Sequence, residues 1–354
     1  MSRRRIMDDP IIISTQTNAP VMRVLWDKGS YKENTFSASE AADKDDAYFK
    51  ALFKNNTEIE YFDEWINFTG LVNQEGNREN GCFQGAINLK HVKIPRSLGS
   101  LGISTFQGCT NLESIEIPDT VWAIGSNTYN TYSSGTFNGC SSLTSIYIPD
   151  SVTQCGRSSF ANCTNLEYIR WSSNCPFDYQ NRASSYLGPF SNCTHLSTID
   201  NFDGNITNLC YGSFHNCTSL DVVDLLSASW NKLTNLYGSC FENCDFKNKD
   251  VSIPNVVTVG TLTFRTKNVG KIEIGPNLTS LGTFAFACND SPTGIFIFRG
   301  LNPPAWNQNL FAYNTFSIYV PYSSNQSVLN AYKTAWSSVA SRIFELDENG
   351  NIPE

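Results

Sequence analysis

Residues 106–118 read Phe-Gln-Gly-Cys-Thr-Asn-Leu-Glu-Ser-Ile-Glu-Ile-Pro, and residues 137–149 read Phe-Asn-Gly-Cys-Ser-Ser-Leu-Thr-Ser-Ile-Tyr-Ile-Pro. Both stretches are copies of one unit, Phe-x-x-Cys-x-x-Leu-x-x-Ile-x-Ile-Pro. Further copies run over residues 160–171, 190–199 and 214–225, and residues 83–95 repeat the unit with Ala86 in place of Cys. Later copies keep only the Phe and an alternating apolar pair: Phe264 with Ile272 and Ile274, Phe286 with Ile295 and Ile297, and Phe311 with Ile318 and Val320.

The phenylalanines that begin the units recur with a nearly fixed period. They are mostly 22–25 residues apart, with longer intervals at insertions, and their positions are Phe83, Phe106, Phe137, Phe160, Phe190, Phe214, Phe241, Phe264, Phe286 and Phe311. A period of this length indicates a solenoid, because a single repeat cannot bury its own apolar face and must stack on its neighbours. The positions that recur between copies are the ones that the stack requires.

Each unit predicts one coil with one short strand. In Leu-x-x-Ile-x-Ile the alternate Ile residues point inward, and the Pro ends the strand because it cannot donate to a ladder. Asn-Cys-Thr and Gly-Cys-Ser predict tight turns whose side chains satisfy exposed backbone groups. The predicted fold class is therefore a mainly β repeat solenoid of about ten coils with one parallel sheet, over residues 81–322.

The repeated unit resembles the BspA-like leucine-rich repeats of surface proteins from gut and oral anaerobes, some protists, and phages of those bacteria. The resemblance covers roughly residues 81–322 and extends to the end of the chain, where Ile318-Tyr-Val-Pro321 precedes a helical pattern. It implies adhesion or partner binding, and it brings no catalytic motif that could be transferred to this sequence.

The ends of the chain predict two caps. Residues 1–80 are predicted to be an N-terminal arm and α/β cap, with a strand over 21–26, a helix that begins at the capping box Ser37-Ala-Ser-Glu40, and an atypical first coil over 59–71. Residues 323–345 carry apolar residues at helical spacing and predict a C-terminal capping helix, followed by a polar tail to residue 354. Insertions at 126–135 and 174–189 are predicted to be loops on one flank of the rod.

Six cysteines occupy the same position of the unit: Cys109, Cys140, Cys163, Cys193, Cys217 and Cys244. Adjacent coils are close enough for disulfides, but a ladder with one Cys per coil offers no preferred pair, so we expect buried free thiols with a structural role. No Cys-x-x-Cys pair is present, and the three His lie at different offsets, so we expect neither a metal site nor a cofactor.

Composition restricts the remaining classes of function. The chain has 354 residues and a formal net charge of −8, which argues against nucleic acid as a partner. No apolar stretch reaches the length of a membrane span, so we expect no membrane insertion. The common nucleotide-binding, serine-hydrolase and metalloprotease motifs are missing, which disfavours an enzyme built on a solenoid scaffold.

The residue between the two inward positions forms an outward column that varies from unit to unit: Lys93, Glu116, Tyr147, Arg170, Asp200, Asp224, Ser252, Glu273, Phe296 and Tyr319. We predict that Tyr147, Tyr168 of the neighbouring column and Arg170 anchor a partner, since aromatic residues and Arg dominate interface energetics. Asp200, Phe296 and Tyr319 complete the predicted face, and exposed aromatic rings also suit stacking on sugars. The alternative is a solvated face on which Arg170 and Asp200 form an ordinary cross-strand charge pair.

Two settings fit such a protein. The first residues carry basic side chains but no apolar stretch behind them, so no secretion signal is predicted, and a phage virion component is the favoured expectation. In that setting the partners are other proteins of the particle or a host surface, and the N-terminal arm is a candidate oligomer contact. The alternative is a bacterial cell-surface adhesin that binds a host protein or glycan.

Overall fold

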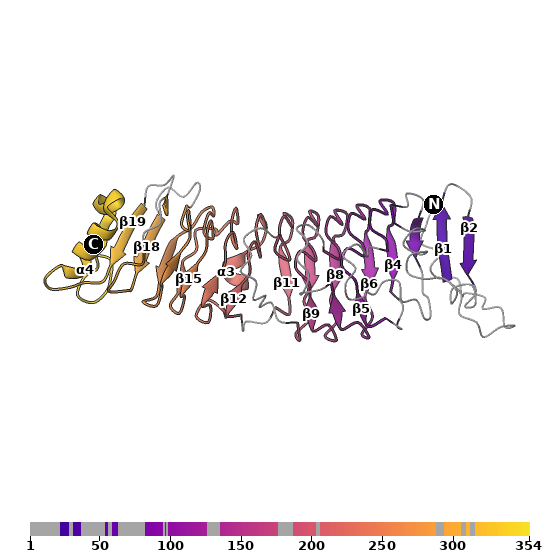
Figure 1. Ribbon diagram of the computed structural model, residues 1–354, viewed down its shortest axis with the longest axis horizontal. Coiled ribbons are helices and arrows are strands. Elements are labelled where there is room, and N and C mark those ends of the chain that lie inside the picture. The colour runs from indigo at the N-terminus through magenta and orange to yellow at the C-terminus, as the bar shows by residue number, and fades with distance from the viewer. Residues whose placement is uncertain are drawn as a thin grey trace.

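The computed structural model describes residues 22–27, 31–36, 54–55, 59–62, 82–94, 96, 98–125, 135–175, 187–202, 206–287, 294–305, 309–311 and 316–354. Here the chain winds into a rod of about nine parallel turns, with the N-terminal strands at one end and the C-terminal helix at the other (Figure 1). The predicted fold class, a mainly β solenoid, is confirmed.

The first row of strands uses the Ile-x-Ile part of each unit. Its members are β4 (His91–Lys93), β6 (Ser114–Glu116), β8 (Ser145–Tyr147), β10 (Tyr168–Arg170), β11 (Thr198–Asp200), β14 (Val251–Ile253), β16 (Lys271–Ile274), β18 (Gly294–Phe298) and β19 (Phe316–Val320). Equivalent residues of neighbouring coils pair in parallel register, so Ile146, Ile169 and Ile199 lie side by side and are buried. The residues on either side of these three Ile residues point outward, as the two-residue period of a strand requires.

A second row of parallel strands corrects the prediction of a single sheet. It contains β5 (Ser100–Leu101), β7 (Ala123–Ile124), β9 (Gln154–Cys155), β12 (Asn208–Leu209), β13 (Asn235–Leu236), β15 (Thr258–Val259) and β17 (Ser280–Leu281). The second residue of each strand is buried. Because these strands are only two residues long, they cannot produce the alternation by which a strand is recognised in a sequence.

One unit departs from the strand that its sequence predicts. In the copy over residues 214–225 the outward position Asp224 lies in a short helix, α3 (Val222–Leu225). The side chain of Asp221 accepts a hydrogen bond from the backbone N–H of Asp224, which caps this helical turn. Lys249 Nζ lies 2.8 Å from Asp221 Oδ2 and 2.6 Å from Asp224 Oδ1, and thus compensates both carboxylates.

The phenylalanines that define the repeat form one continuous column inside the rod. From Phe83 to Phe311, each ring lies 5.4 to 6.3 Å from the ring of the next coil, measured between centroids. Most neighbouring rings are within 19° of parallel, and Phe241 and Phe264 are tilted by 35°. The column runs through the core, where an aromatic pair contributes more than its buried area alone.

The six repeated cysteines line the same interior. Each thiol donates to the carbonyl oxygen of the Phe one coil earlier, at 3.0 or 3.1 Å; Cys163, for example, donates to Phe137. All cysteines that the structure describes are unbridged and buried. Burial raises the pKa of the thiols of Cys109 and Cys163 to about 12, so they remain protonated donors at neutral pH.

The residue immediately before the Cys position of the unit is Gly or Asn with a positive φ. It is Gly85, Gly108 and Gly139 in the first three coils and Asn162, Asn192, Asn216 and Asn243 in the next four. The asparagines add a side-chain ladder, because each Nδ2 donates to the Oδ1 of the preceding Asn at 2.6 to 2.8 Å from Asn192 onward. Asn162 begins the ladder by donating to Asn138 Oδ1 at 2.9 Å.

At the N-terminal end, β1 (Met22–Asp27) pairs antiparallel with β2 (Tyr31–Phe36) and with β3 (Ile59–Phe62), and β3 pairs parallel with β4. The strand expected over residues 21–26 corresponds to β1. The expected helix after Ser37, the basic arm, and most of the coil expected over 59–71 lie outside the described residues. The same is true of most of the insertions at 126–135 and 174–189.

At the C-terminal end, α4 (Ser327–Ala335) and η2 (Ser337–Arg342) are followed by β20 (Ile343–Glu345), which pairs parallel with β19. The helix and its end bury Val328, Leu329, Tyr332 and Trp336. The expected helix through residue 345 is thus too long, since Ile343 starts a strand that adds to the sheet. Arg299 Nη1 donates to the carbonyl oxygen of Gly350 at 2.9 Å, which holds the tail against this end of the rod.

Candidate binding surface

The outward side of β8, β10 and β11 brings four of the predicted residues together. Tyr147 and Asp200 lie beside Arg170 in the parallel register, and Tyr168 lies two residues before Arg170 on the same strand. Tyr147 is 54% exposed and Tyr168 is 38% exposed, which is unusual for large aromatic side chains in this rod. We call these four residues the tyrosine cluster.

Arg170 is placed over the ring of Tyr147. Its Cζ atom lies 4.6 Å from the ring centroid, which is within the range of a cation–π contact. The pairing follows from the register, since Tyr147 and Arg170 are Cα partners on adjacent strands. One face of the Tyr147 ring is thereby fixed against the guanidinium.

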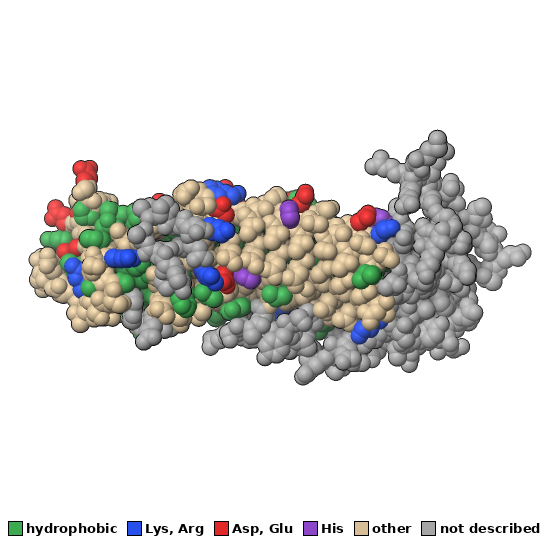
Figure 2. Space-filling model, turned by 90° about the horizontal axis from the view of Figure 1, so that it is seen from above, with side chains coloured by type: hydrophobic (Ala, Val, Ile, Leu, Met, Phe, Trp, Pro, Cys, Tyr) green, Lys and Arg blue, Asp and Glu red, His purple; other side chains and the backbone are tan. Residues whose placement is uncertain are grey.

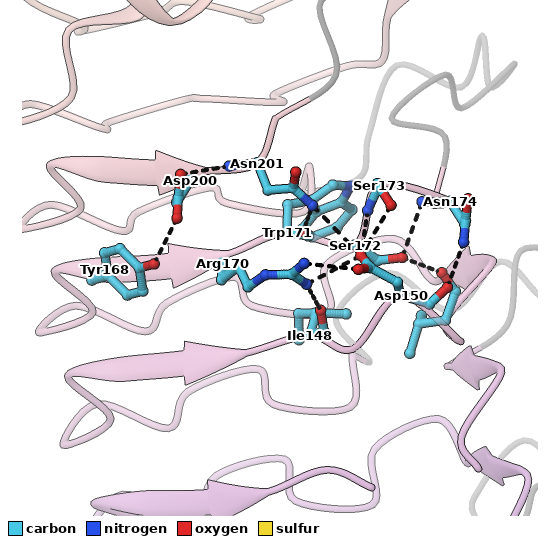
Figure 3. A network of polar contacts seen from close by, with 11 residues as sticks. Ile148, Asp150, Tyr168, Arg170, Trp171, Ser172, Ser173, Asn174, Asp200 and Asn201 are labelled. Carbon is cyan, nitrogen blue, oxygen red and sulfur yellow. Dashed lines mark hydrogen bonds and ion pairs between the residues drawn. The ribbon is translucent and has the colours of Figure 1, made fainter. Parts of the chain in front are cut away.

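Arg170 is itself clamped by Asp150, which lies just after the Pro that ends β8 (Figure 3). The guanidinium donates to both carboxylate oxygens, with Nη1 3.1 Å from Oδ1 and Nη2 2.8 Å from Oδ2, and Nη1 also donates to the carbonyl oxygen of Ile148 at 3.1 Å. This bidentate geometry fixes the plane of the guanidinium as well as its position. The alternative in which Arg170 forms a cross-strand charge pair with Asp200 is not what the structure shows, because the ion pair of Arg170 is with Asp150.

Asp150 is held in turn by the segment that follows β10. Ser173 donates to Asp150 Oδ1 from its backbone N–H at 2.9 Å and from its hydroxyl at 3.0 Å, and Asn174 Nδ2 donates to the carbonyl oxygen of Asp150 at 2.7 Å. The hydrogen bonds from Arg170, and after them those from Ser173, lower the pKa of the Asp150 carboxyl well below the usual range of an aspartate. The carboxylate therefore stays charged at any ordinary pH and keeps Arg170 in place.

Tyr168 is fixed by a separate contact. Its hydroxyl donates to Asp200 Oδ2 at 3.0 Å, and Asp200 Oδ1 accepts from the backbone N–H of Asn201 at 2.9 Å (Figure 3). Burial and the neighbouring carboxylate raise the pKa of Tyr168, so its hydroxyl remains a donor. Asn201 has a positive φ of 58° and donates from Nδ2 to the carbonyl oxygen of Trp171 at 3.0 Å, which anchors the end of β11.

The other two predicted surface residues do not join the tyrosine cluster. Phe296 was expected to point outward, but it is 1% exposed and packs 5.1 Å from the ring of Phe311, so this prediction is wrong. In β18 the inward residues are Phe296 and Phe298, which pair with Ile272 and Ile274 of β16. Tyr319 does point outward, but it lies near the C-terminal end, where its ring is 5.7 Å from that of Phe344.

The residues that hold the tyrosine cluster were missed in the sequence, namely Asp150, Ser173, Asn174 and Asn201. Asp150 could have been suspected, because it follows the strand-ending Pro149 and therefore lies near the end of the next strand in a stack. The contacts of Ser173 and Asn174 depend on the path of the chain after Trp171, and no spacing in the sequence predicts this path.

The edge of the rod that carries the Phe-x-x-Cys turns offers less to a partner. Figure 2 looks down on the rod from above and shows a broad area with few charged side chains over its middle. Hydroxyl groups in these turns already form hydrogen bonds with the neighbouring coil. Thr194 donates to the carbonyl oxygen of Thr164 at 3.2 Å, and Thr218 donates to that of Thr194 at 3.1 Å. Near this area Glu242 pairs with Arg265 at 3.0 Å and lies 3.8 Å from His215 Nε2, which makes a charge network between coils.

Within the described residues, no group of three or more His, Cys, Asp and Glu side chains is arranged to hold a metal ion. Among the same residues, none of the helices has the length and hydropathy needed to cross a bilayer.

Comparison with known proteins finds a family whose model matches the repeat. The family described as BspA type leucine rich repeat region matches in six copies, over residues 76–180, 128–244 and 186–316. No curated protein matches the chain.

The solved structures that resemble the chain include the following three. A leucine rich repeat protein from T. pallidum is 26% identical with a TM-score of 0.34, and the match covers 43% of this chain and 62% of that chain. The chain therefore spans less than two thirds of that relative. A leucine-rich repeat protein from Bacteroides ovatus ATCC 8483 is 17% identical, with coverage of 83% and 97% and a TM-score of 0.34. A leucine rich cell surface protein from Faecalibacterium prausnitzii A2-165 is 16% identical, with coverage of 83% and 93% and a TM-score of 0.38.

Proposed function

Since the chain belongs to the BspA type leucine rich repeat family, we propose that it is a non-enzymatic binding protein whose partner rests on the outward face of β8, β10 and β11. The observation that carries this proposal is the fixed geometry of the tyrosine cluster. Two exposed tyrosines are each held by a charged residue, and one of those residues is clamped by a further carboxylate.

Preorganisation distinguishes this face from a merely solvated one. An exposed side chain with no role usually keeps its rotamer freedom, because fixing it costs conformational entropy. When the rings are already fixed, a partner that packs on them does not meet that entropic cost at binding. Aromatic residues and Arg are also the side chains on which binding energy concentrates.

The polar groups of the tyrosine cluster support binding rather than catalysis. Arg170 and Asp150 are held in a bidentate ion pair, so neither serves as a free acid, base or electrophile. The six repeated thiols are buried and protonated, which leaves them without the thiolate that a nucleophile requires.

The test compares binding of the full chain and of a variant with Tyr147→Ala, Tyr168→Ala and Arg170→Ala. Intact bacterial and mammalian cells are used as binding surfaces, and bound protein is measured by flow cytometry. Trp122→Ala is the matched control, because Trp122 is also an exposed aromatic residue, at 51%, but it precedes β7 in the second row of strands. We expect binding that falls at least about tenfold in the triple variant and remains in the control. Equal binding by the wild type and the triple variant would refute the proposal.

Two settings fit this role. One is a phage particle that uses the rod for assembly or host attachment, and the other is a bacterial cell surface that displays it as an adhesin. Quantitative mass spectrometry of density-banded phage particles, compared with cell-surface and cytoplasmic fractions, separates them. Stoichiometric recovery in particles identifies a virion component. Recovery on cells with none in particles identifies an adhesin.

A further inference from the structure

We infer that the partner of the tyrosine cluster is a neutral carbohydrate, whose sugar rings stack on Tyr147 and Tyr168 and whose hydroxyl groups donate to Asp200. This inference rests on the proposed function and names the chemical class of its ligand. Three features of the tyrosine cluster support it. Arg170 is already paired with Asp150, one face of the Tyr147 ring is already occupied by Arg170, and the carboxylate of Asp200 can accept further hydrogen bonds.

The charges disfavour an anionic ligand. The only cation of the tyrosine cluster is Arg170, and both of its terminal nitrogens are engaged by Asp150, with Nη1 bound to Ile148 as well. The carboxylate of Asp150 thus already compensates this cation, and an incoming sialate, sulfate or phosphate would also approach the exposed carboxylate of Asp200. Like charges repel, and the tyrosine cluster has no second cation that would offset the repulsion.

A cation stacked on the ring of Tyr147 is disfavoured by a different contact. The face of an aromatic ring attracts a cation through its quadrupole, and Arg170 already occupies one face of Tyr147 at 4.6 Å from the centroid. A second cation on the same ring would be repelled by the first. The apolar C–H face of a sugar ring has no such conflict and can cover the exposed part of either tyrosine.

Acceptor capacity and hydroxyl groups remain where a sugar would lie. The described contacts give Asp200 one donor on each carboxylate oxygen, Tyr168 on Oδ2 and Asn201 on Oδ1, whereas each such oxygen can accept about two. Ser145 and Thr198 are the Cα partners of Tyr168 on the two adjacent strands, and both are exposed. A ring on Tyr168 would therefore lie between two hydroxyl groups and beside a carboxylate, which are the groups that bind sugar hydroxyls.

The direct test is a glycan microarray that carries neutral, sialylated and sulfated glycans, probed with the full chain. We expect binding to one class of neutral glycan, with an apparent affinity that falls at least about tenfold in Tyr168→Ala and in Tyr147→Ala. Asp200→Asn should weaken binding less than Tyr168→Ala, because it keeps an acceptor oxygen. Trp122→Ala is again the control, and far-ultraviolet circular dichroism and the thermal midpoint show that each variant is folded.

Three results would overturn the inference: no binding to any neutral glycan, binding only to sialylated or sulfated glycans, or neutral-glycan binding that the tyrosine variants leave unchanged. Treatment of the cell surfaces used above separates this failure from failure of the proposed function. Periodate oxidises the vicinal diols of sugars, whereas proteinase K removes proteins. If binding depends on the tyrosines and survives periodate but not proteinase K, the face binds a protein, so the proposed function stands and the carbohydrate is excluded.

Discussion

The asparagine ladder gives the sharpest test of how the repeat specifies the rod, and Asn192 lies at its centre. Its backbone has a φ of 64°, its Nδ2 donates to Asn162 at 2.8 Å, and its Oδ1 accepts from Asn216 at 2.6 Å. Two properties are therefore combined in one residue: a left-handed backbone and two side-chain hydrogen bonds. Substitution by Gly removes only the side-chain hydrogen bonds, whereas substitution by Ala removes them and also places a residue that disfavours the left-handed backbone.

The magnitudes follow from these contacts. Loss of two half-buried hydrogen bonds costs about 2 kcal/mol, at about 1 kcal/mol each. Gly adopts the left-handed backbone without strain, but it makes the unfolded chain more flexible, which adds about 0.5–1 kcal/mol. Ala instead carries the left-handed penalty of about 1–2 kcal/mol. We expect N192G to lose about 2.5–3 kcal/mol of unfolding free energy and N192A to lose about 3–4 kcal/mol.

The measurement is urea denaturation of the full chain, followed by both tryptophan fluorescence and circular dichroism. Asn165→Ala is the matched control, because Asn165 is an exposed asparagine three residues after Asn162, and its loss should change the unfolding free energy by no more than about 0.5 kcal/mol. If N192G were as stable as the wild type, the ladder would contribute nothing. If N192A were no less stable than N192G, the left-handed backbone would not be the constraint that selects Gly or Asn at this position.

Three further predictions concern the core and the surface clamp. Phe160→Ala, which interrupts the ring column, should lower the unfolding free energy by about 3–5 kcal/mol in the same urea experiment, whereas Phe160→Leu should lower it less. The repeated thiols should resist iodoacetamide in the native chain at pH 8 and react once the chain is unfolded, as mass spectrometry of labelled Cys163 would show; fast native labelling would contradict their burial and raised pKa. Because the pKa of Asp150 is lowered in the folded state, its stabilising contribution is fully present above the unfolded value of about 4 and is lost as the pH falls further. The difference in stability between the wild type and Asp150→Asn should therefore shrink between pH 5 and pH 2, and a difference that grew over this range would contradict the assignment.

The repeat made the stack predictable because each inward position serves the same purpose in every coil. The Phe column, the thiols at one position and the buried Ile residues all follow from copies that can be compared within one chain. The second row of strands also has a signature in the sequence. In several units an apolar or Cys residue stands immediately before a Gly, as in Leu101-Gly102, Ile124-Gly125, Val259-Gly260 and Leu281-Gly282.

The prediction failed where the pattern became ambiguous. In β18 the segment Ile295-Phe-Ile-Phe298 has apolar residues at both parities, so alternation alone could not decide which pair is inward. The structure favours Phe296 and Phe298, because their rings contact the Phe column and Trp336. Similarly, Val222-Val-Asp-Leu225 fits the spacing of a strand, but a capping carboxylate at Asp221 and a salt bridge from a later coil favour a helical turn.

The tyrosine cluster differs from both cases, since its key contact joins residues that belong to different parts of the unit. Arg170 and Tyr147 share a column and could be paired from the register alone, but Asp150 lies after the strand of the coil before. Columns that only maintain the stack repeat one contact from coil to coil: each repeated cysteine donates to the carbonyl oxygen of the Phe one coil earlier, and each Asn from Asn192 onward donates to the Asn one coil earlier. Among the described residues, the pair of Arg170 with Asp150 is not repeated at the equivalent positions of other coils, so stacking does not require it. Its effect is local, because it fixes the guanidinium beside Tyr147, and this restriction is the reason to seek a ligand at these coils rather than along the whole rod.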